Sequence, residues 1–166
     1  AGLSQLREQL VGFVEKEGPL LAICGGYQII GKEWLMAGEE VPGLSLVDLT
    51  TKRAEGGSHN RLVGNIVLES PLAQTPVVGF ENHAGRTYLG DGVQPFGKVM
   101  GSCGFGNNDS DRADGACYKN LIGSYLHGPL LAKNPEIADV LLSRALERRV
   151  GCAVSLPKLD DTAELN

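Results

Sequence analysis

The chain has 166 residues, a formal net charge of −5, and 42% hydrophobic residues. This length is enough for one hydrophobic core, and the acidic balance leaves no basic surface of the kind that binds nucleic acid. No apolar run approaches the roughly 18 residues that cross a membrane, and no signal-peptide pattern opens the sequence, so we expect a cytoplasmic globular domain without membrane insertion.

A helix is the first expected element. The apolar residues near the start recur at helical spacing, and Gly18-Pro19 ends the pattern. These apolar residues are Leu3, Leu6, Leu10, Phe13 and Val14.

The most informative segment follows this helix. Leu20–Ile23 is an uninterrupted apolar run that predicts a strand buried on both faces. Cys24 comes next, then Gly25-Gly26 and a helical pattern through Met36. A cysteine at such a tight turn has a strained backbone and projects above the sheet edge. The first helical N–H groups are expected to lower the pKa of Cys24, and the N–H of Gly25 to bind an oxyanion. A buried structural cysteine is the alternative interpretation.

The middle of the chain predicts a different kind of sheet. The segments 62–69, 77–81 and 97–100 are short, interrupted by Gly and Pro, and partly alternating, which favours antiparallel or mixed pairing. The spacing Asp109-x-Asp111-x-x-Asp114-Gly115 hints at a calcium loop but lacks the closing glutamate, so it predicts a solvated loop.

A second buried strand is expected over 121–126, with His127 and the turn pair Gly128-Pro129 directly after it. Reactive groups collect at the carboxyl ends of parallel strands. His127 could therefore lie beside Cys24, take the thiol proton and return it to a leaving amine. A lone histidine in this position is otherwise a surface or core residue.

The remaining features are simpler. The four cysteines are scattered and have neither Cys-x-x-Cys nor zinc spacing, so we expect reduced thiols and no metal site. Pro135 opens an amphipathic helix with one apolar face. Residues 151–166 are expected to form a polar, disordered tail. The apolar face of the helix comprises Ile137, Val140, Leu141, Ala145 and Leu146.

These motifs carry a family resemblance. Cys-Gly-Gly-Tyr-Gln at 24–28 and Tyr-Leu-His-Gly-Pro at 125–129 resemble the class I glutamine amidotransferases of the cobyric-acid-synthase-like (CobB/CobQ) branch. The block Gly-Phe-Glu-Asn-His-Ala-Gly-Arg-Thr-Tyr at 79–88, with shorter matches at 60–62, 106–108 and 118–120, is similar to the glutaminase subunit (GatD type) of lipid II isoglutaminyl synthase. The resemblance extends from about residue 20 to residue 146.

The resemblance implies an α/β, flavodoxin-like, three-layer fold with a mixed, mostly parallel sheet. It implies hydrolysis of L-glutamine through a thioester on Cys24, with His127 as base and acid. Gln28 is expected to bind the glutamine side chain and Arg61 its α-carboxylate. Groups of Asn82 and His83 are expected to hold the amino-acid end, and His83 is a rival to His127 as the base. His59 is expected to face solvent.

One residue departs from the family pattern. Many class I members have His-Pro-Glu, in which the glutamate orients the imidazole, whereas here the sequence is His127-Gly128-Pro129. The missing carboxylate suggests either a Cys–His dyad or an orienting acid from a partner subunit.

The resemblance also implies that the domain over 1–150 is incomplete at its amino-terminal end, since family members carry earlier strands there. The second oxyanion donor of the family lies in that earlier part. Losing one such donor costs about 10²- to 10³-fold in turnover, so we expect the chain as written to be nearly inactive.

The implied partner is a Mur-ligase-like synthase subunit, forming a heterodimer that amidates the α-carboxylate of D-glutamate in lipid II. No cofactor is expected in this chain, and ATP and Mg²⁺ are expected on the ligase subunit. One alternative is an amidotransferase of another CobB/CobQ-type synthase, acting in cobyrinate amidation. A non-catalytic interaction module is the other.

Overall fold

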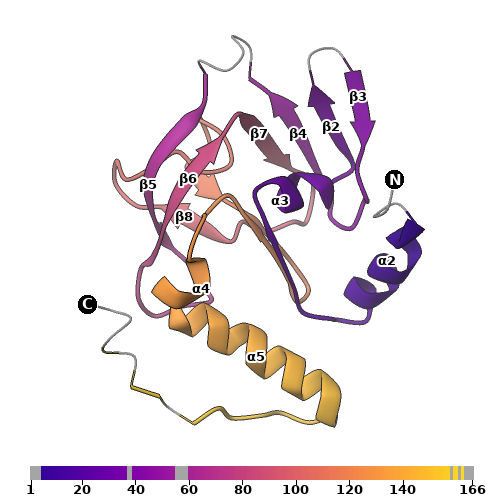
Figure 1. Cartoon of the computed structure of the whole chain (residues 1–166), viewed down its shortest axis with the longest axis vertical. Helices are drawn as coiled ribbons and strands as arrows, with labels where there is room; N and C mark the ends of the chain where they lie inside the picture. Colours follow the sequence, from indigo (N-terminus) through magenta and orange to yellow (C-terminus); the bar gives the residue numbers. More distant parts are fainter. Residues whose placement is uncertain (1–4, 37–38, 55–59, 158, 161, 163–166) are drawn as a thin grey trace.

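The structure is a computed structural model that describes residues 5–36, 39–54, 60–157, 159, 160 and 162. Leu3, His59 and part of the expected tail, 151–166, lie outside these residues. Figure 1 shows two groups of strands side by side, with α5 running beneath them and α2 at one end. In chain order the elements are α2 (Arg7–Glu15), β1 (Leu20–Ile23), α3 (Gly25–Ile29), β2 (Glu33–Met36), β3 (Glu39–Pro42), β4 (Leu49–Arg53), β5 (Leu62–Glu69), β6 (Val77–His83), β7 (Gly85–Leu89), β8 (Gly97–Val99), β9 (Ala113–Asp114), β10 (Ala116–Tyr118), β11 (Leu121–Ser124), α4 (Leu130–Lys133) and α5 (Pro135–Val150).

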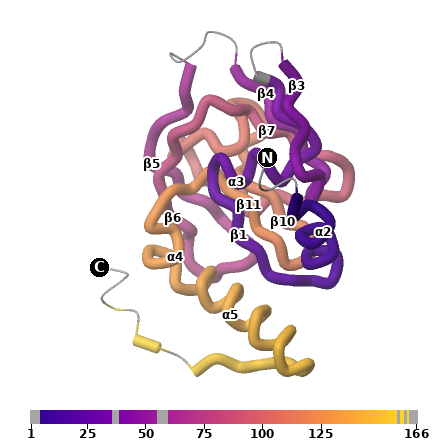
Figure 2. The backbone as a smooth tube through the Cα atoms, turned by 45° about the vertical axis from the view of Figure 1, so that its right-hand side comes forward, coloured from indigo at the N-terminus to yellow at the C-terminus, as the bar shows by residue number. Residues whose placement is uncertain are grey.

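The sheet that matters most for function has the strand order β1-β11-β10. β1 and β11 are parallel, in a register that pairs Leu20 with Leu121 and Ile23 with Ser124. Both views place these strands next to each other, under α3 (Figure 2). The carboxyl ends of two strands that are about a hundred residues apart in sequence therefore meet at one edge.

The other two sheets have the orders β3-β2-β4-β7 and β6-β5-β8-β9. β2 and β4 are parallel, whereas β5 pairs antiparallel with both β6 and β8. The antiparallel character predicted for the middle segments is confirmed. The architecture is mixed as expected, but the described pairings are mainly antiparallel rather than mostly parallel, because short connections such as 70–76 join neighbouring strands directly.

Two hydrophobic clusters form the core, and β11 with the two residues after it separates them. Leu121 and Tyr125 belong to one cluster, and Ile122 and Leu126 to the other. All of these side chains are fully buried, so the prediction of a strand buried on both faces is confirmed for β11. The same prediction is only partly correct for β1, where Ala22 is buried but its three neighbours are partly exposed. The reason is that β1 is an edge strand among the described residues.

The helix after Cys24 is shorter than predicted, since α3 ends at Ile29 and residues 33–36 form β2. Gly31 lies against β4, where a Cβ atom would meet Leu49 Cδ1 at 2.3 Å and Leu49 O at 2.7 Å. The N–H of Lys32 donates to Leu49 O at 2.9 Å. Pairing with β4 therefore overrides the local helical pattern.

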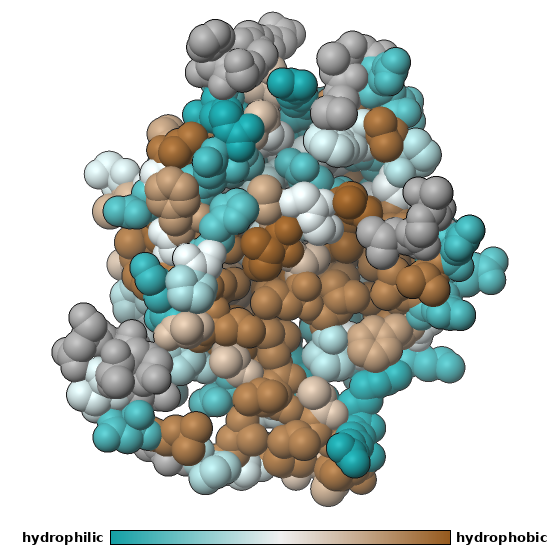
Figure 3. Space-filling view, viewed as in Figure 1, coloured by the Kyte–Doolittle hydropathy of each residue, from teal (hydrophilic) through white to brown (hydrophobic). Residues whose placement is uncertain are grey.

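The two long helices differ in how they pack. In α2, Val14 is buried, whereas Leu6 and Phe13 are exposed. α5 begins at Pro135 as predicted and ends at Val150, and the residue that caps it, Gly151, is left-handed at φ 77°. Its first half packs on the core, but Leu146 is 36% exposed. In Figure 3, which has the same view as Figure 1, apolar residues cover the centre of the visible face and continue over α5. Among the helices that the structure describes, none is long and apolar enough to cross a membrane.

Candidate active site

Cys24 lies at the turn between β1 and α3, with φ 50° and ψ −106°. A non-glycine residue in such a conformation costs on the order of 1–3 kcal/mol and is kept only where surrounding contacts hold it. Here the N–H of Cys24 donates to Ser124 O at 2.9 Å, and its carbonyl accepts from the N–H of Gln28 at 3.0 Å. The strained turn predicted for Cys24 is confirmed.

Glycine at position 123 allows α3 to approach β11 closely. A Cβ atom at Gly123 would meet the ring of Tyr27 at 2.3 Å. α3, which follows Cys24, therefore packs directly on β11, which leads to His127. Both residues of the predicted dyad are thus positioned by the same strand.

The pKa of the Cys24 thiol is raised rather than lowered, contrary to the sequence prediction. Burial is the largest cause, because it disfavours the thiolate, and it outweighs a backbone hydrogen bond from Gly25 and the positive charge of Arg61. The expected helix N–H effect exists but is the smaller contribution. The thiol is therefore protonated at neutral pH and needs a base to become a nucleophile.

A pocket of about 250 Å³ opens beside Cys24. It brings together five of the seven predicted site residues, whereas Gly25 and His127 are not part of its lining. Four lining residues were not predicted from the sequence, among them Trp34, for which a helix was expected. The described lining residues are Cys24, Gln28, Trp34, Arg53, Arg61, Asn82, His83, Ala84 and Gly85.

Arg61 is held at the pocket rim by Asn82. Its Nε donates to Asn82 Oδ1 and its Nη2 to Asn82 O, both at 2.8 Å. Both residues are exposed. The side chain of Asn82 is therefore engaged in positioning the guanidinium, whose charge reaches Cys24.

Gln28 belongs to a buried polar network beneath the pocket. Its Nε2 donates to the hydroxyl of Tyr125 at 3.2 Å, and that hydroxyl bonds to Thr87 Oγ1 at 2.7 Å. Gly85 leaves the space for this network, since a Cβ atom there would lie 2.4 Å from Gln28 Nε2. The amide of Gln28 is thus fixed in one orientation.

His127 follows β11 and is anchored by its backbone to β6. Its N–H donates to Phe80 O at 2.7 Å. The imidazole Nε2 is buried and has no hydrogen-bond partner among the described residues. A buried imidazole nitrogen without a partner is costly in a stable fold, so this atom is available for a proton donor or acceptor.

His83, the rival base, has both ring nitrogens engaged. Nδ1 lies 2.8 Å from Gly85 O, and Nε2 lies 3.3 Å from the buried carboxylate of Glu81. The ring stacks on Tyr125 with 3.5 Å between the centroids. Glu81 also accepts from the N–H groups of Phe105 and Gly106. His83 is therefore held in a buried hydrogen-bond network by Glu81 and Gly85.

The loop at 109–115 is only partly solvated, which corrects the sequence prediction. Asp109 and Asp111 are exposed, but Asp114 is fully buried. Its carboxylate accepts a 2.6 Å hydrogen bond from the Ser124 hydroxyl, a contact that loop composition does not reveal. The described part of the chain contains no group of three metal-ligating side chains.

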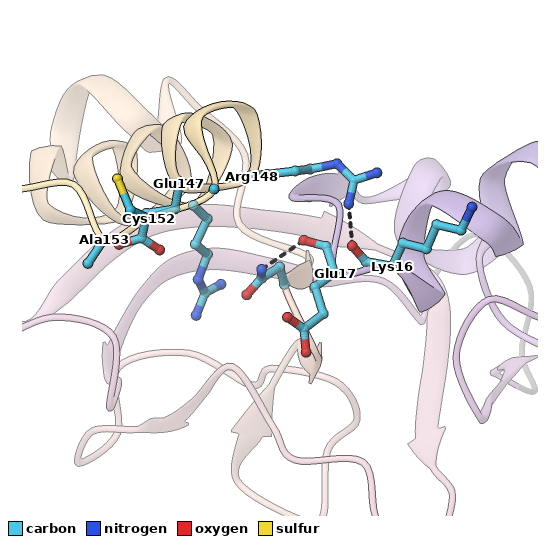
Figure 4. Close-up of a pocket in the computed structure, with 9 residues that line it drawn as sticks. Lys16, Glu17, Glu147, Arg148, Cys152 and Ala153 are labelled. Atoms are coloured by element: carbon cyan, nitrogen blue, oxygen red, sulfur yellow. Dashed lines mark hydrogen bonds between the residues drawn. The ribbon is translucent and has the colours of Figure 1, made fainter.

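A larger hollow, of about 420 Å³, lies between the end of α5 and the connection from α2 to β1 (Figure 4). Arg148 donates to the carbonyl of Lys16, and Asn120 donates to the carbonyl of Glu17. None of the predicted site residues lines it. We therefore place the functional site at the pocket beside Cys24.

The chain is similar to known glutamine amidotransferases. Residues 2–135 match the CobB/CobQ-like glutamine amidotransferase domain. The chain is 45% identical, over 164 residues, to the lipid II isoglutaminyl synthase (glutamine-hydrolyzing) subunit GatD of Staphylococcus aureus (strain N315), covering 98% of this chain and 63% of that protein. It is 36% identical to the subunit of the same name from Streptococcus pneumoniae (strain ATCC BAA-255 / R6), covering 93% of this chain and 58% of that protein.

Cobyric acid synthases match a smaller share of this chain. A cobyric acid synthase of Listeria innocua serovar 6a is 33% identical over 133 residues, which cover 75% of this chain and 24% of that protein. A crystal structure of a glutamine amidotransferase aligns with a TM-score of 0.59 at 20% identity, covering 84% of this chain and 68% of that one. This alignment shows a shared fold. The chain spans less than two thirds of the length of either GatD relative.

Proposed function

This chain belongs to the CobB/CobQ-like glutamine amidotransferase family, and on that premise we propose that it is the glutamine-hydrolysing part of a lipid II isoglutaminyl synthase. The observation that carries the proposal is Cys24, held at φ 50° between β1 and α3 beside a pocket of about 250 Å³. A strained cysteine at a strand-to-helix turn is an arrangement suited to a covalent nucleophile.

The chemistry follows from the groups around Cys24. His127 takes the thiol proton, and the thiolate attacks the γ-carbonyl of L-glutamine. The N–H of Gly25 stabilises the oxyanion. The imidazolium returns the proton to the leaving group, so that ammonia departs and a γ-glutamyl thioester remains. Water, deprotonated by His127, then hydrolyses the thioester to glutamate and the free thiol.

His127 is a better candidate for the base than His83. The Nε2 of His127 has no partner among the described residues, whereas Glu81 and Gly85 occupy both nitrogens of His83. A general base needs a nitrogen that can reach the thiol proton directly or through one water. His83 then serves the site by supporting the lining around Asn82 and Ala84.

Recognition of glutamine is assigned to the cation and amides of the pocket. Arg61 binds the α-carboxylate, because its guanidinium is presented at the rim and its charge is felt at Cys24. Asn82 orients that guanidinium through two hydrogen bonds. Gln28 binds the substrate amide from the floor of the pocket.

The partner and acceptor are proposed from the relatives. The two GatD relatives are named as subunits of a lipid II isoglutaminyl synthase, and each covers more of this chain than the cobyric acid synthase does. We assign ammonia transfer to a Mur-ligase-like subunit that carries ATP and Mg²⁺ and amidates the D-glutamate α-carboxylate. Four free cysteines fit a reducing, cytoplasmic location.

The proposed function is tested with the complete protein assembled with this ligase subunit. Glutamine, ATP and lipid II are expected to give ammonia-dependent amidation of the stem peptide, and an electrophilic glutamine analogue is expected to label Cys24. Labelling of Cys24 without amidation of lipid II would support the alternative that the chain is the glutaminase of another synthase, such as one that amidates cobyrinate. The absence of both labelling and ammonia release would support a non-catalytic interaction module.

Substitution of Arg61 tests substrate recognition. Arg61→Ala is expected to raise the KM for glutamine by about 10- to 100-fold with a smaller change in kcat, because a charged hydrogen-bonded pair contributes about 1.5–3 kcal/mol. Arg61→Lys should restore little, since a point charge cannot reproduce the planar fork that Asn82 holds. Steady-state ammonia release measures both, with Arg112→Ala as the control, because Arg112 is exposed and lies outside the pocket lining. An unchanged KM in both Arg61 variants would contradict the role.

A further inference from the structure

Asp114 is a buried carboxyl that the proposed chemistry does not use. It ends the two-residue strand β9 and has no solvent exposure. Its Oδ2 accepts from the Ser124 hydroxyl at 2.6 Å, and its Oδ1 faces the N–H of Tyr125 at 3.4 Å. A fully buried carboxyl is uncommon unless its hydrogen bonds are needed where it lies.

The segment that Asp114 contacts is the end of β11 and the turn that leads to His127. Ser124 Oγ, besides donating to Asp114, accepts from the N–H of Leu126 at 3.0 Å. The next backbone group, the N–H of His127, donates to Phe80 O at 2.7 Å. The backbone of residues 124–127 is therefore fastened at one end by Asp114 and at the other by β6.

The same segment also contacts the nucleophile and the pocket floor. Ser124 O accepts the N–H of Cys24 at 2.9 Å, which is one of the bonds that hold the strained turn. The Tyr125 hydroxyl accepts from Gln28 Nε2 at 3.2 Å. A shift of residues 124–126 would consequently move Cys24 and His127 relative to each other.

We propose that Asp114 is a positioning residue for glutamine hydrolysis, which acts through Ser124 and Leu126 to fix the separation of Cys24 and His127. This inference rests on the proposed function. Asp114 touches neither the thiol nor the imidazole among the contacts of the structure, so its effect is on geometry alone. Misplacing reacting groups by about 1 Å costs on the order of 10²-fold in rate.

Burial also affects the ionisation of Asp114. Burial raises its pKa to about 7, although the hydrogen bonds from Ser124 and Tyr125 act in the opposite direction. The negative charges of Glu81 and Asp111 also raise the pKa, and the phenols of Tyr27 and Tyr125 are the other titratable groups coupled to it. The fold retains a carboxyl here despite its desolvation cost.

The test compares Asp114→Asn and Ser124→Ala with the control Asp91→Asn in the complete protein bound to its partner subunit. Asp91 is an exposed aspartate outside the pocket lining. The amide of Asp114→Asn has one acceptor oxygen in place of two, and Ser124→Ala removes the link from Asp114 to Leu126. Both variants should lower kcat for ammonia release by about 10²-fold. The KM for glutamine should change less than kcat does, because the contacts that hold Arg61 do not involve this segment and Gln28 reaches it only through the Tyr125 hydroxyl.

A second readout does not depend on activity. The NMR signal of the His127 ring, assigned by its loss in His127→Gln, should change its chemical shift in Asp114→Asn and Ser124→Ala but not in Asp91→Asn. A merely structural role for Asp114 would lower the melting temperature and leave the kcat of the folded fraction and the His127 signal unchanged.

The outcomes separate this inference from the proposed function. Wild-type protein without ammonia release would refute the proposed function itself. Active wild-type protein with unchanged kcat in both variants would refute the positioning role alone. If Asp114→Asn does not fold, Ser124→Ala decides by the same two criteria.

Discussion

Replacing Cys24 with alanine is expected to reduce glutamine hydrolysis by on the order of 10⁴-fold or more, since removal of a covalent nucleophile eliminates the thioester route. The thiol is only half-buried at the rim of the pocket, so its loss removes little core volume. Binding of the partner subunit should be unaffected. Ammonia release under saturating glutamine measures the first effect, and co-purification with the partner measures the second.

Cys103→Ala is the matched control for this experiment. Cys103 is a free, exposed cysteine that does not line the pocket, and its substitution should leave ammonia release at the wild-type level. Substantial ammonia release by Cys24→Ala would show that another group is the nucleophile. A parallel loss in Cys103→Ala would indicate a general sensitivity to thiol removal.

The partner subunit is expected to accelerate labelling of Cys24 by an electrophilic glutamine analogue, by on the order of 10²- to 10⁴-fold, the usual contribution of an oriented general base. The raised pKa of Cys24 keeps the thiol protonated, so we expect labelling to depend on the proposed base, His127. The buried carboxylates of Glu81 and Asp114 already accept hydrogen bonds from other groups. We therefore expect the acid that orients His127 to come from the ligase subunit.

Two controls make this prediction specific. A partner whose interface carboxylate is neutralised should dock but fail to accelerate labelling. In His127→Gln the wild-type partner should give no acceleration, because the base that it orients is missing. Equal labelling rates with and without the partner would show that Cys24 and His127 suffice as a dyad.

Sequence periodicity was enough to place the reactive turn and the strand before His127. Leu20–Ile23 is an uninterrupted apolar run and Leu121–Leu126 is a mostly apolar one, and each is followed by a single chemically active residue and glycine. Local patterns of this kind survive folding because backbone pairing and burial both favour them. The two segments meet because β1 and β11 are parallel.

Other parts of the site depend on contacts between residues that are distant in sequence, so local sequence patterns could not predict them. Trp34 reaches the pocket because Gly31 turns the chain onto β4 and ends the helix at Ile29. Asp114 lies in a stretch of polar and small residues that is typical of solvated loops, yet it is buried by the strand that contains Ser124. The pKa of Cys24 depends on the balance between burial and two nearby groups, and sequence shows only the favourable groups.

The position of β11 between the two hydrophobic clusters has a consequence for motion. Because Leu121 and Ile122 belong to opposite clusters, the strand cannot detach from one side without disrupting the other. Its amide hydrogens should consequently exchange with solvent only in global unfolding. The histidine is thus attached to one of the least mobile segments of the domain, whereas Arg61 is exposed and held by the exposed Asn82. We therefore expect Arg61 to adjust its position when glutamine binds, while β11 keeps the proposed base in place.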